Sequence, residues 1–175
     1  MHTTPVDGNG TDLKAVAKNI APDCKVVFSE SKLSVQDLNA MYNIADVVVN
    51  IASNEGWGLS STEAMLAGTP IINNVTGGLQ DQCGFVEPGP HGKWIRFNGE
   101  FPTNHMGKFK THGVWAKPVF PSNRSLQGSV PTPYIFDDRC QPEDVADAMH
   151  HWWDMDLPLR VEYGQAGREF CLAKG

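Results

Sequence analysis

The sequence predicts an α/β protein in which helices cover both faces of a mostly parallel sheet. Short apolar runs of strand length alternate with longer segments whose apolar residues recur every three or four positions. A glycine-flanked turn, Gly56 to Gly58, joins one such run to a helical segment. Helices placed between strands require crossover connections, which make neighbouring strands parallel and cover the sheet on both sides. The 175 residues, 41% of them hydrophobic, suffice to bury a core as one domain, residues 1–175.

The first part of the chain predicts two helices with a strand between them. Thr11 or Asp12 is suited to cap the first helix, because short polar side chains accept hydrogen bonds from its free amides. Residues 25–28 are a short apolar run, expected as a buried strand. Ser34 and Asp37 mark the start of the second helix. The apolar residues expected on the inner faces are Leu13, Val16, Ala17 and Ile20, and then Leu38, Met41 and Ala45.

The rest of the chain continues the alternation. Three more strands are expected, at 47–51, 70–74 and 134–136. A short helix begins at Gly78 or Leu79, and a longer one begins at Pro142, since proline suits the first position of a helix. The last helix follows Pro158. The inner-face residues expected in these two helices are Val145, Ala148, Met149, Trp152 and Trp153, and then Leu159, Tyr163, Ala166 and Phe170.

Residues 84–133 break this pattern and predict a long irregular insertion. The stretch holds seven glycines, seven prolines and seven aromatic residues, without a sustained period of a strand or a helix. Its net charge is +4, which leaves −10 for the remainder of a chain whose total is −6. One interpretation is a segment that binds phosphates or stacks on a sugar or base. The other is a solvated surface excursion whose cations balance an acidic domain.

Composition excludes several classes of protein and site. The net charge of −6 argues against a general nucleic-acid binder. No apolar run approaches the roughly 20 residues of a membrane span, and the first residues lack the features of a signal peptide. The four cysteines have no metal-binding spacing, so reduced thiols in a cytoplasmic protein are expected. His91, His105 and His112 match no zinc pattern, and the pair Asp137–Asp138 is better explained by a turn and a helix cap than by a metal.

Two glutamates eight positions apart, Glu55 and Glu63, lie in the most informative segment of the chain. Glu55 precedes the glycine turn, and Glu63 is expected in the first turn of the helix that follows. The loop would then lie at the carboxyl end of a buried parallel strand, where ligands of open α/β sheets usually bind. The start of the helix would favour an anion. A purely structural alternative has Ser60 and Glu63 as a capping box, with Gly56 and Gly58 permitting a tight turn.

With its flanks, this segment resembles the E-x7-E signature of the retaining, nucleotide-sugar-dependent family-4 glycosyltransferases of the GT-B fold. The matching residues are Glu55, the turn Gly56-Trp57-Gly58, Glu63-Ala64-Met65, Gly68-Thr69-Pro70-Ile71 and Gly77-Gly78, with Ala45-Asp46-Val47 upstream. The similarity covers about 24–82 well and 134–170 more loosely. Trp57 stands where the family commonly has Phe or Tyr.

The resemblance implies a role for each residue of the segment. Glu63 would accept hydrogen bonds from the ribose hydroxyls of a nucleotide diphosphate sugar, and Glu55, the candidate catalytic residue, would hold a hydroxyl of the transferred sugar. The amides of Trp57 and Gly58 would contact the sugar next to Gly56, and those of Leu59 and Ser60 would contact the pyrophosphate. The activity implied is hexosyl transfer with retention of configuration to an unknown acceptor, without a metal or other cofactor.

The resemblance also implies that the chain is an incomplete part of the enzyme. It matches a Rossmann-like, C-terminal donor-binding domain, so we expect a partner domain or chain that brings the acceptor. No counterpart of the family's pyrophosphate-binding Arg and Lys is evident before Asp12, because Lys14 and Lys18 fall on a helix. Two alternatives are a nucleotide-sugar-binding module without turnover and a sugar-nucleotide epimerase of the GT-B fold.

Overall fold

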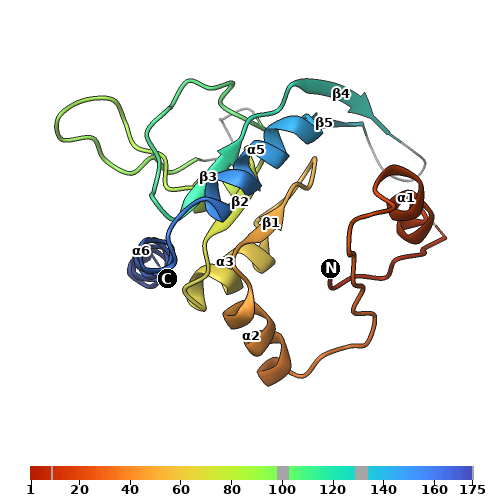
Figure 1. Cartoon of the computed structure of the whole chain (residues 1–175). Coiled ribbons are helices and arrows are strands. Elements are labelled where there is room, and N and C mark those ends of the chain that lie inside the picture. Colours follow the sequence, from red (N-terminus) through yellow and green to blue (C-terminus); the bar gives the residue numbers. More distant parts are fainter. Residues whose placement is uncertain (9, 98–102, 129–133, 175) are drawn as a thin grey trace. The chain divides into compact units, whose positions relative to one another are not determined.

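The computed structural model describes residues 1–8, 10–97, 103–128 and 134–174. The chain forms two compact units, Met1–Leu38 and Asn39–Gly175, and each is described by itself. Figure 1 shows the helices and strands of both units.

The first unit contains helix α1, Leu13–Ile20. As predicted, Asp12 caps it, because its carboxylate accepts a hydrogen bond from the amide of Ala15 at 2.9 Å. The prediction of a buried strand at 25–28 is wrong, since these residues are mostly exposed and form no strand. A strand needs a neighbour for its backbone groups, and among the described residues of this unit the pairing is an isolated bridge between His2 and Ser29. No residue of α1 is buried, so its predicted inner face is also wrong.

Three parallel strands form the sheet of the second unit within the part of the chain that the structure describes. They are β1 (Val48–Asn50), β2 (Ile71–Asn74) and β3 (Ala116–Val119), in that order across the sheet (Figure 1). Helix α3 (Leu59–Leu66) connects β1 to β2. The prediction of a Rossmann-like α/β fold with a parallel sheet is therefore confirmed.

Helices cover both faces of this sheet. Adjacent residues of a strand point to opposite faces, and Ile71 and Ile72 of β2 accordingly belong to two separate clusters of buried side chains. Ile71 packs with Ala64 and Met65 of α3. Ile72 packs with residues of α5, Pro142–Trp153, on the other face. Both isoleucines are fully buried, so the sheet forms the centre of the second unit.

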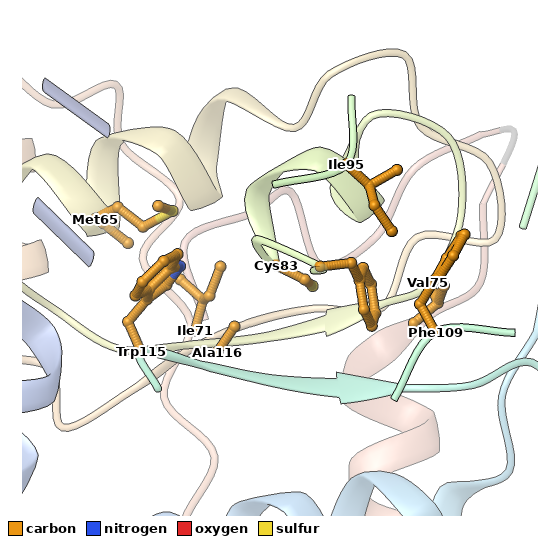
Figure 2. Close-up of a cluster of buried hydrophobic side chains, with 10 residues drawn as sticks. Met65, Ile71, Val75, Cys83, Ile95, Phe109, Trp115 and Ala116 are labelled. Carbon is orange, nitrogen blue, oxygen red and sulfur yellow. The ribbon is translucent and has the colours of Figure 1, made fainter. Parts of the chain in front are cut away.

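The larger cluster lies between the sheet, α3 and the segments that follow β2. Figure 2 shows Met65 beside Trp115 and Ile71 at one end of it, and Val75 with Phe109 at the other. Short helix α4, Leu79–Gln82, begins where the sequence predicts it. Trp115 also donates its indole N–H to the carbonyl of Gln82 at 3.0 Å, which fixes α4 to the start of β3.

The described residues of 84–133 contribute to this core. They supply β3, strand β4 (Asn123–Gln127) and buried side chains of the larger cluster, namely Phe85, Ile95, Phe109, Trp115 and Ala116. The prediction that the stretch is irregular is wrong for these strands. β3 is short and contains Pro118, and a proline argues against a strand because it is rare within sheets. The sequence therefore does not predict this strand. Residues 98–102 and 129–133 lie outside the described residues.

Strand β5, Ile135–Arg139, contains most of the predicted strand at 134–136 but does not join the parallel sheet. It pairs antiparallel with β4 in a separate two-stranded sheet. β4 and β5 follow one another closely along the chain, and a short connection permits only antiparallel pairing.

The last helix, α6 (Leu157–Lys174), packs on α3, and its Gly164 lies against the turn that follows α3. A Cβ at Gly164 would lie 1.9 Å from the carbonyl oxygen of Gly68, so no side chain fits there. In α5, Trp152 is buried as predicted, but Trp153 is 78% exposed. Adjacent residues of a helix point in different directions, so both tryptophans cannot face the core. Leu159 of α6, another predicted inner residue, is 38% exposed.

Among the described residues, none of the helices combines the length and the apolar character that a bilayer crossing requires. All four cysteines are free thiols in the structure.

His105 lies within a cluster of aromatic rings. Its ring is stacked on Phe97 at 5.7 Å and meets Phe85 at 4.4 Å between ring centres. Only 5% of the residue is exposed. Burial disfavours the charged imidazolium and lowers the pKa of His105 from 6.5 to about 4, with a smaller contribution from Lys110.

We therefore expect the stability of the protein to fall as the pH decreases from about 6.5 towards 4. In this range the unfolded chain binds a proton at His105 and the native state does not, so protonation favours unfolding. His105→Gln should make the thermal midpoint less dependent on pH in this range. The matched variant His91→Gln, at an exposed histidine, should keep the wild-type dependence. Equal pH dependence of both variants would contradict the assignment to His105.

Candidate functional site

The predicted site lies where two neighbouring parallel strands end. The loop 51–58 follows β1, the turn Gly77–Gly78 follows β2, and α3 begins directly after the loop. Because carboxyl ends of parallel strands share one edge of a sheet, the loop and the turn meet there. The amide of Gly78 donates to the carbonyl oxygen of Glu55 at 3.2 Å.

Glycines allow the loop and the turn to approach this closely. A Cβ at Gly77 would lie 1.9 Å from the oxygen of Glu55, and a Cβ at Gly78 would lie 2.4 Å from that of Gly56. Gly77 also has a φ of +47°, which L side chains rarely adopt. The backbone of the turn therefore sets the position of Glu55 and Gly56.

The side chain of Glu55 folds back over its own loop. It is half-buried, and its Oε1 accepts a hydrogen bond from the amide of Trp57 at a long 3.4 Å. At this distance the bond is weak, so both groups are available to a ligand that offers shorter ones.

A side chain of α4 binds the backbone of Trp57 and Gly58. The side-chain amide of Gln82 donates to the carbonyl oxygens of both residues, at 3.0 Å for Gly58. The indole N–H of Trp57 donates to the hydroxyl of Thr62 at 2.9 Å, while half of the residue stays exposed. Sequence reasoning missed Gln82, because nothing in a short polar helix indicates which side chain reaches the loop.

Helix α3 begins one residue after a left-handed glycine. Gly58 is its N-cap with a φ of +86°, and a Cβ there would lie 2.4 Å from Leu79. Leu59 and Ser60 are the first two residues of the helix and are exposed. Their amides precede the first intrahelical hydrogen bond, so they point out of the helix start, where anions bind favourably.

The capping-box interpretation of Ser60 and Glu63 is wrong. Gly58 occupies the N-cap, and no side chain caps this helix. Ser60 is therefore already helical, and its hydroxyl accepts a hydrogen bond from Asn50 at 3.3 Å. Glu63 consequently falls just beyond the first turn of α3, two positions later than a capping box requires.

Glu63 is instead paired with a tyrosine of α2, Val35–Ile44. The hydroxyl of Tyr42 donates to Oε2 of Glu63 at 2.8 Å, and Glu63 is otherwise exposed. Burial, followed by the hydrogen bond and the charge of Glu63, raises the pKa of Tyr42 well above its usual value. The contact orients one carboxylate oxygen and leaves the other open to solvent. Tyr42 is a second residue that sequence reasoning missed, although it lies four positions after Leu38 on the same face.

The cations of 84–133 have several partners among the described residues. The ammonium groups of Lys108 and Lys110 each lie 5.3 Å from the centre of an aromatic ring, and the Arg124 guanidinium lies 4.3 Å from that of Phe136. A pocket of about 350 Å³ is lined by Trp57 together with Arg96 and Lys174.

Histidines and acidic residues form no metal centre in the part of the chain that the structure describes. His105 is in the core, and His112 contacts the carbonyl oxygen of Gly113 through its Nδ1 at 2.9 Å. The turn-and-cap explanation of Asp137 and Asp138 is wrong, because both lie within β5 and Gln141 is the N-cap of α5.

Comparisons with known proteins find similarity in the part of the chain that contains this site. Residues 9–93 match the family model of group 1 glycosyl transferases, and this range includes Tyr42, Glu55, Glu63 and Gln82. A 60-residue segment is 35% identical to a trehalose synthase of Pyrococcus horikoshii, covering 34% of this chain and 14% of the relative. Trehalose synthases of Thermococcus litoralis and Pyrococcus furiosus are each 32% identical over 60 residues, covering 34% of this chain and 15% of the relatives. The matched segment thus spans about one seventh of these proteins. These similarities support a glycosyltransferase domain.

The contact between Tyr42 and Glu63 predicts a measurable change in tyrosine ionisation. In Glu63→Gln, Tyr42 should ionise at a lower pH than in the wild type, because the neighbouring negative charge is gone. Burial remains, so part of the shift should persist. Absorbance titration in alkaline solution measures this, with Glu87→Gln, an exposed glutamate outside the loop, as the control. An unchanged titration in Glu63→Gln would show that the two side chains do not interact.

Proposed function

We propose that this chain is the donor-binding domain of a retaining glycosyltransferase, which transfers a hexosyl group from a nucleotide diphosphate sugar. The observation that carries the proposal is the arrangement of the two glutamates. Glu55 lies in the loop after β1, Glu63 lies on α3, and the exposed residues Leu59 and Ser60, whose amides begin the helix, lie between them along the chain. A sugar, a pyrophosphate and a ribose are bound by these groups in that order.

The start of α3 receives the pyrophosphate. Transfer of the sugar breaks the bond between the anomeric carbon and a phosphate oxygen, so negative charge grows on the departing nucleotide. Free amides and the positive end of a helix dipole stabilise that charge without rearrangement. The amides of Leu59 and Ser60 are therefore the oxyanion donors of this site, and no metal ion is part of the proposal.

Glu63 accepts hydrogen bonds from the ribose. An ionised carboxylate makes strong, charge-assisted bonds with two vicinal hydroxyls. The contact from Tyr42 at 2.8 Å supports this role, because it holds one oxygen in place and leaves the other free.

Glu55 binds a hydroxyl of the transferred sugar. Its weak bond to the amide of Trp57 opens when the sugar enters, so that the carboxylate and the amide both face the ligand. Gly56 and Gly58 carry no side chain that would obstruct it. Retention of the anomeric configuration belongs to the proposal through the resemblance of this segment to retaining enzymes.

The acceptor is brought by another part of the enzyme, either a second Rossmann-like domain or a partner chain. The trehalose synthases that match here support an acceptor of the carbohydrate class. A cytoplasmic location is also proposed, and the four free thiols support it.

Glu63→Gln should weaken the binding of a nucleoside diphosphate by about tenfold while the protein remains folded, because an amide cannot accept from both ribose hydroxyls as a carboxylate does. Calorimetric titration measures the affinity, and Glu87→Gln is the control with the same chemical change. An unchanged affinity in a folded variant would limit Glu63 to its contact with Tyr42.

Glu55→Ala should discriminate between two ligands. We expect the variant to lose about tenfold in affinity for the sugar nucleotide and to keep most of its affinity for the free nucleoside diphosphate, because Glu55 contacts only the sugar. Titration of a panel of sugar nucleotides, each compared with its free nucleotide, measures the difference. Equal losses for both ligands would show that Glu55 shapes the loop and does not bind the sugar.

A further inference from the structure

A fully buried carboxylate, that of Asp138, lies near the base of the Glu55 loop. The Asp138 side chain has no solvent exposure. Its Oδ2 accepts a hydrogen bond from the hydroxyl of Thr76 at 2.9 Å, and its Oδ1 accepts one from the side-chain amide of Asn104 at 2.7 Å. Nε of Arg124, a residue of β4, lies 3.8 Å from Oδ1 and supplies a compensating charge.

Stability alone is a poor explanation for this carboxylate. Removing a carboxylate from water is expensive, and buried ion pairs often contribute no more stability than apolar residues of the same volume. A network of buried hydrogen bonds, by contrast, fixes the groups that it joins in one arrangement. The residues that this network contacts therefore indicate which part of the site Asp138 holds in place.

The backbone of Asp138 holds the first part of the loop that follows β1. Its amide donates to the carbonyl oxygen of Ser53 at 2.8 Å, and its own carbonyl oxygen accepts from the side chain of Asn74 at 2.7 Å. The same Asn74 amide group donates to the carbonyl oxygen of Ala52 at 2.9 Å. One residue further on, the side chain of Asn54 donates to the carbonyl oxygen of Phe136 at 3.3 Å.

The side chain of Asp138 holds the residue next to the turn Gly77–Gly78. Thr76, its partner, directly precedes Gly77 and Gly78, the turn that contacts the backbone of Glu55. A single residue thus fixes the loop before Glu55 through its backbone and the turn against Glu55 through its carboxylate. No described contact links Asp138 to Tyr42 or Glu63.

We propose that Asp138 is a positioning residue for Glu55, so that it controls recognition of the transferred sugar without touching it. This proposal rests on the proposed function for the identity of the ligand. It assigns a role to β5, which lies outside the region 9–93 that matches the glycosyl transferase family.

The first experiment needs no ligand. Hydrogen exchange of the amides of residues 54–58 is compared in the wild type, Asp138→Asn and Asp137→Asn. The control makes the same chemical change one residue away, where the carboxylate pairs with Arg139 at 3.1 Å. We expect faster exchange in Asp138→Asn alone, because only this change replaces one of the two oxygens that accept from Thr76 and Asn104 by an amide NH2. Wild-type exchange of the loop in Asp138→Asn would overturn the proposal.

The second experiment measures affinity for a sugar nucleotide and for the free nucleoside diphosphate. Asp138→Asn should weaken binding of the sugar nucleotide by about tenfold, because a small displacement of a binding group lowers affinity strongly. Binding of the free nucleoside diphosphate should stay nearly unchanged. The double variant with Glu55→Ala should be no weaker than Glu55→Ala alone, because Asp138 acts through Glu55. A purely structural role would weaken both ligands equally, and additive losses would also overturn the proposal.

Thr76→Val is the replacement variant if Asp138→Asn does not fold. It keeps the shape of the side chain and removes the hydrogen bond from the Thr76 hydroxyl to Asp138. It should change loop exchange and sugar-nucleotide affinity in the same direction by a smaller factor, and wild-type values would overturn the proposal. If the wild type binds neither ligand, the proposed function fails, and loop exchange alone decides whether Asp138 positions Glu55.

Discussion

The close approach of two backbone segments at the carboxyl ends of β1 and β2 is the constraint on which the site depends. The turn Gly77–Gly78 occupies space beside Glu55 and Gly56 that no Cβ could share. That contact brings the sheet edge, the loop and the start of α3 into one arrangement, since Gly58 at the end of the loop is also the N-cap of the helix. Any movement of the turn is therefore transmitted to the carboxylate of Glu55.

The two glutamates of the signature are supported by different parts of the molecule. Glu63 is held by a single hydroxyl from α2, and Glu55 rests on a backbone turn and a buried polar network reaching to β5. In the proposed function this separates recognition of the nucleotide from recognition of the sugar. Donor specificity can then change through the loop while the nucleotide affinity is kept.

Sequence reasoning predicted the elements whose pattern is local. Strands β1 and β2, the helix after the glycine turn and the helix from Pro142 are near their expected places, because apolar spacing and capping residues determine them. β3 was missed because Pro118 interrupts its pattern. Tyr42, Gln82 and Asp138 were missed for another reason, since each contacts the site or its network from an element that only the tertiary fold brings near.

Pro118 has a further consequence for the surface of the protein. The carbonyl oxygens of Trp115, just before β3, and of Val119 accept hydrogen bonds from the amides of Ile71 and Val75, so the backbone of position 118 faces away from β2. Proline has no N–H to offer there, and an incoming strand could not complete its ladder at that point. Pro118 therefore removes one backbone donor from the edge of β3. This protects the edge from the intermolecular strand pairing that begins aggregation.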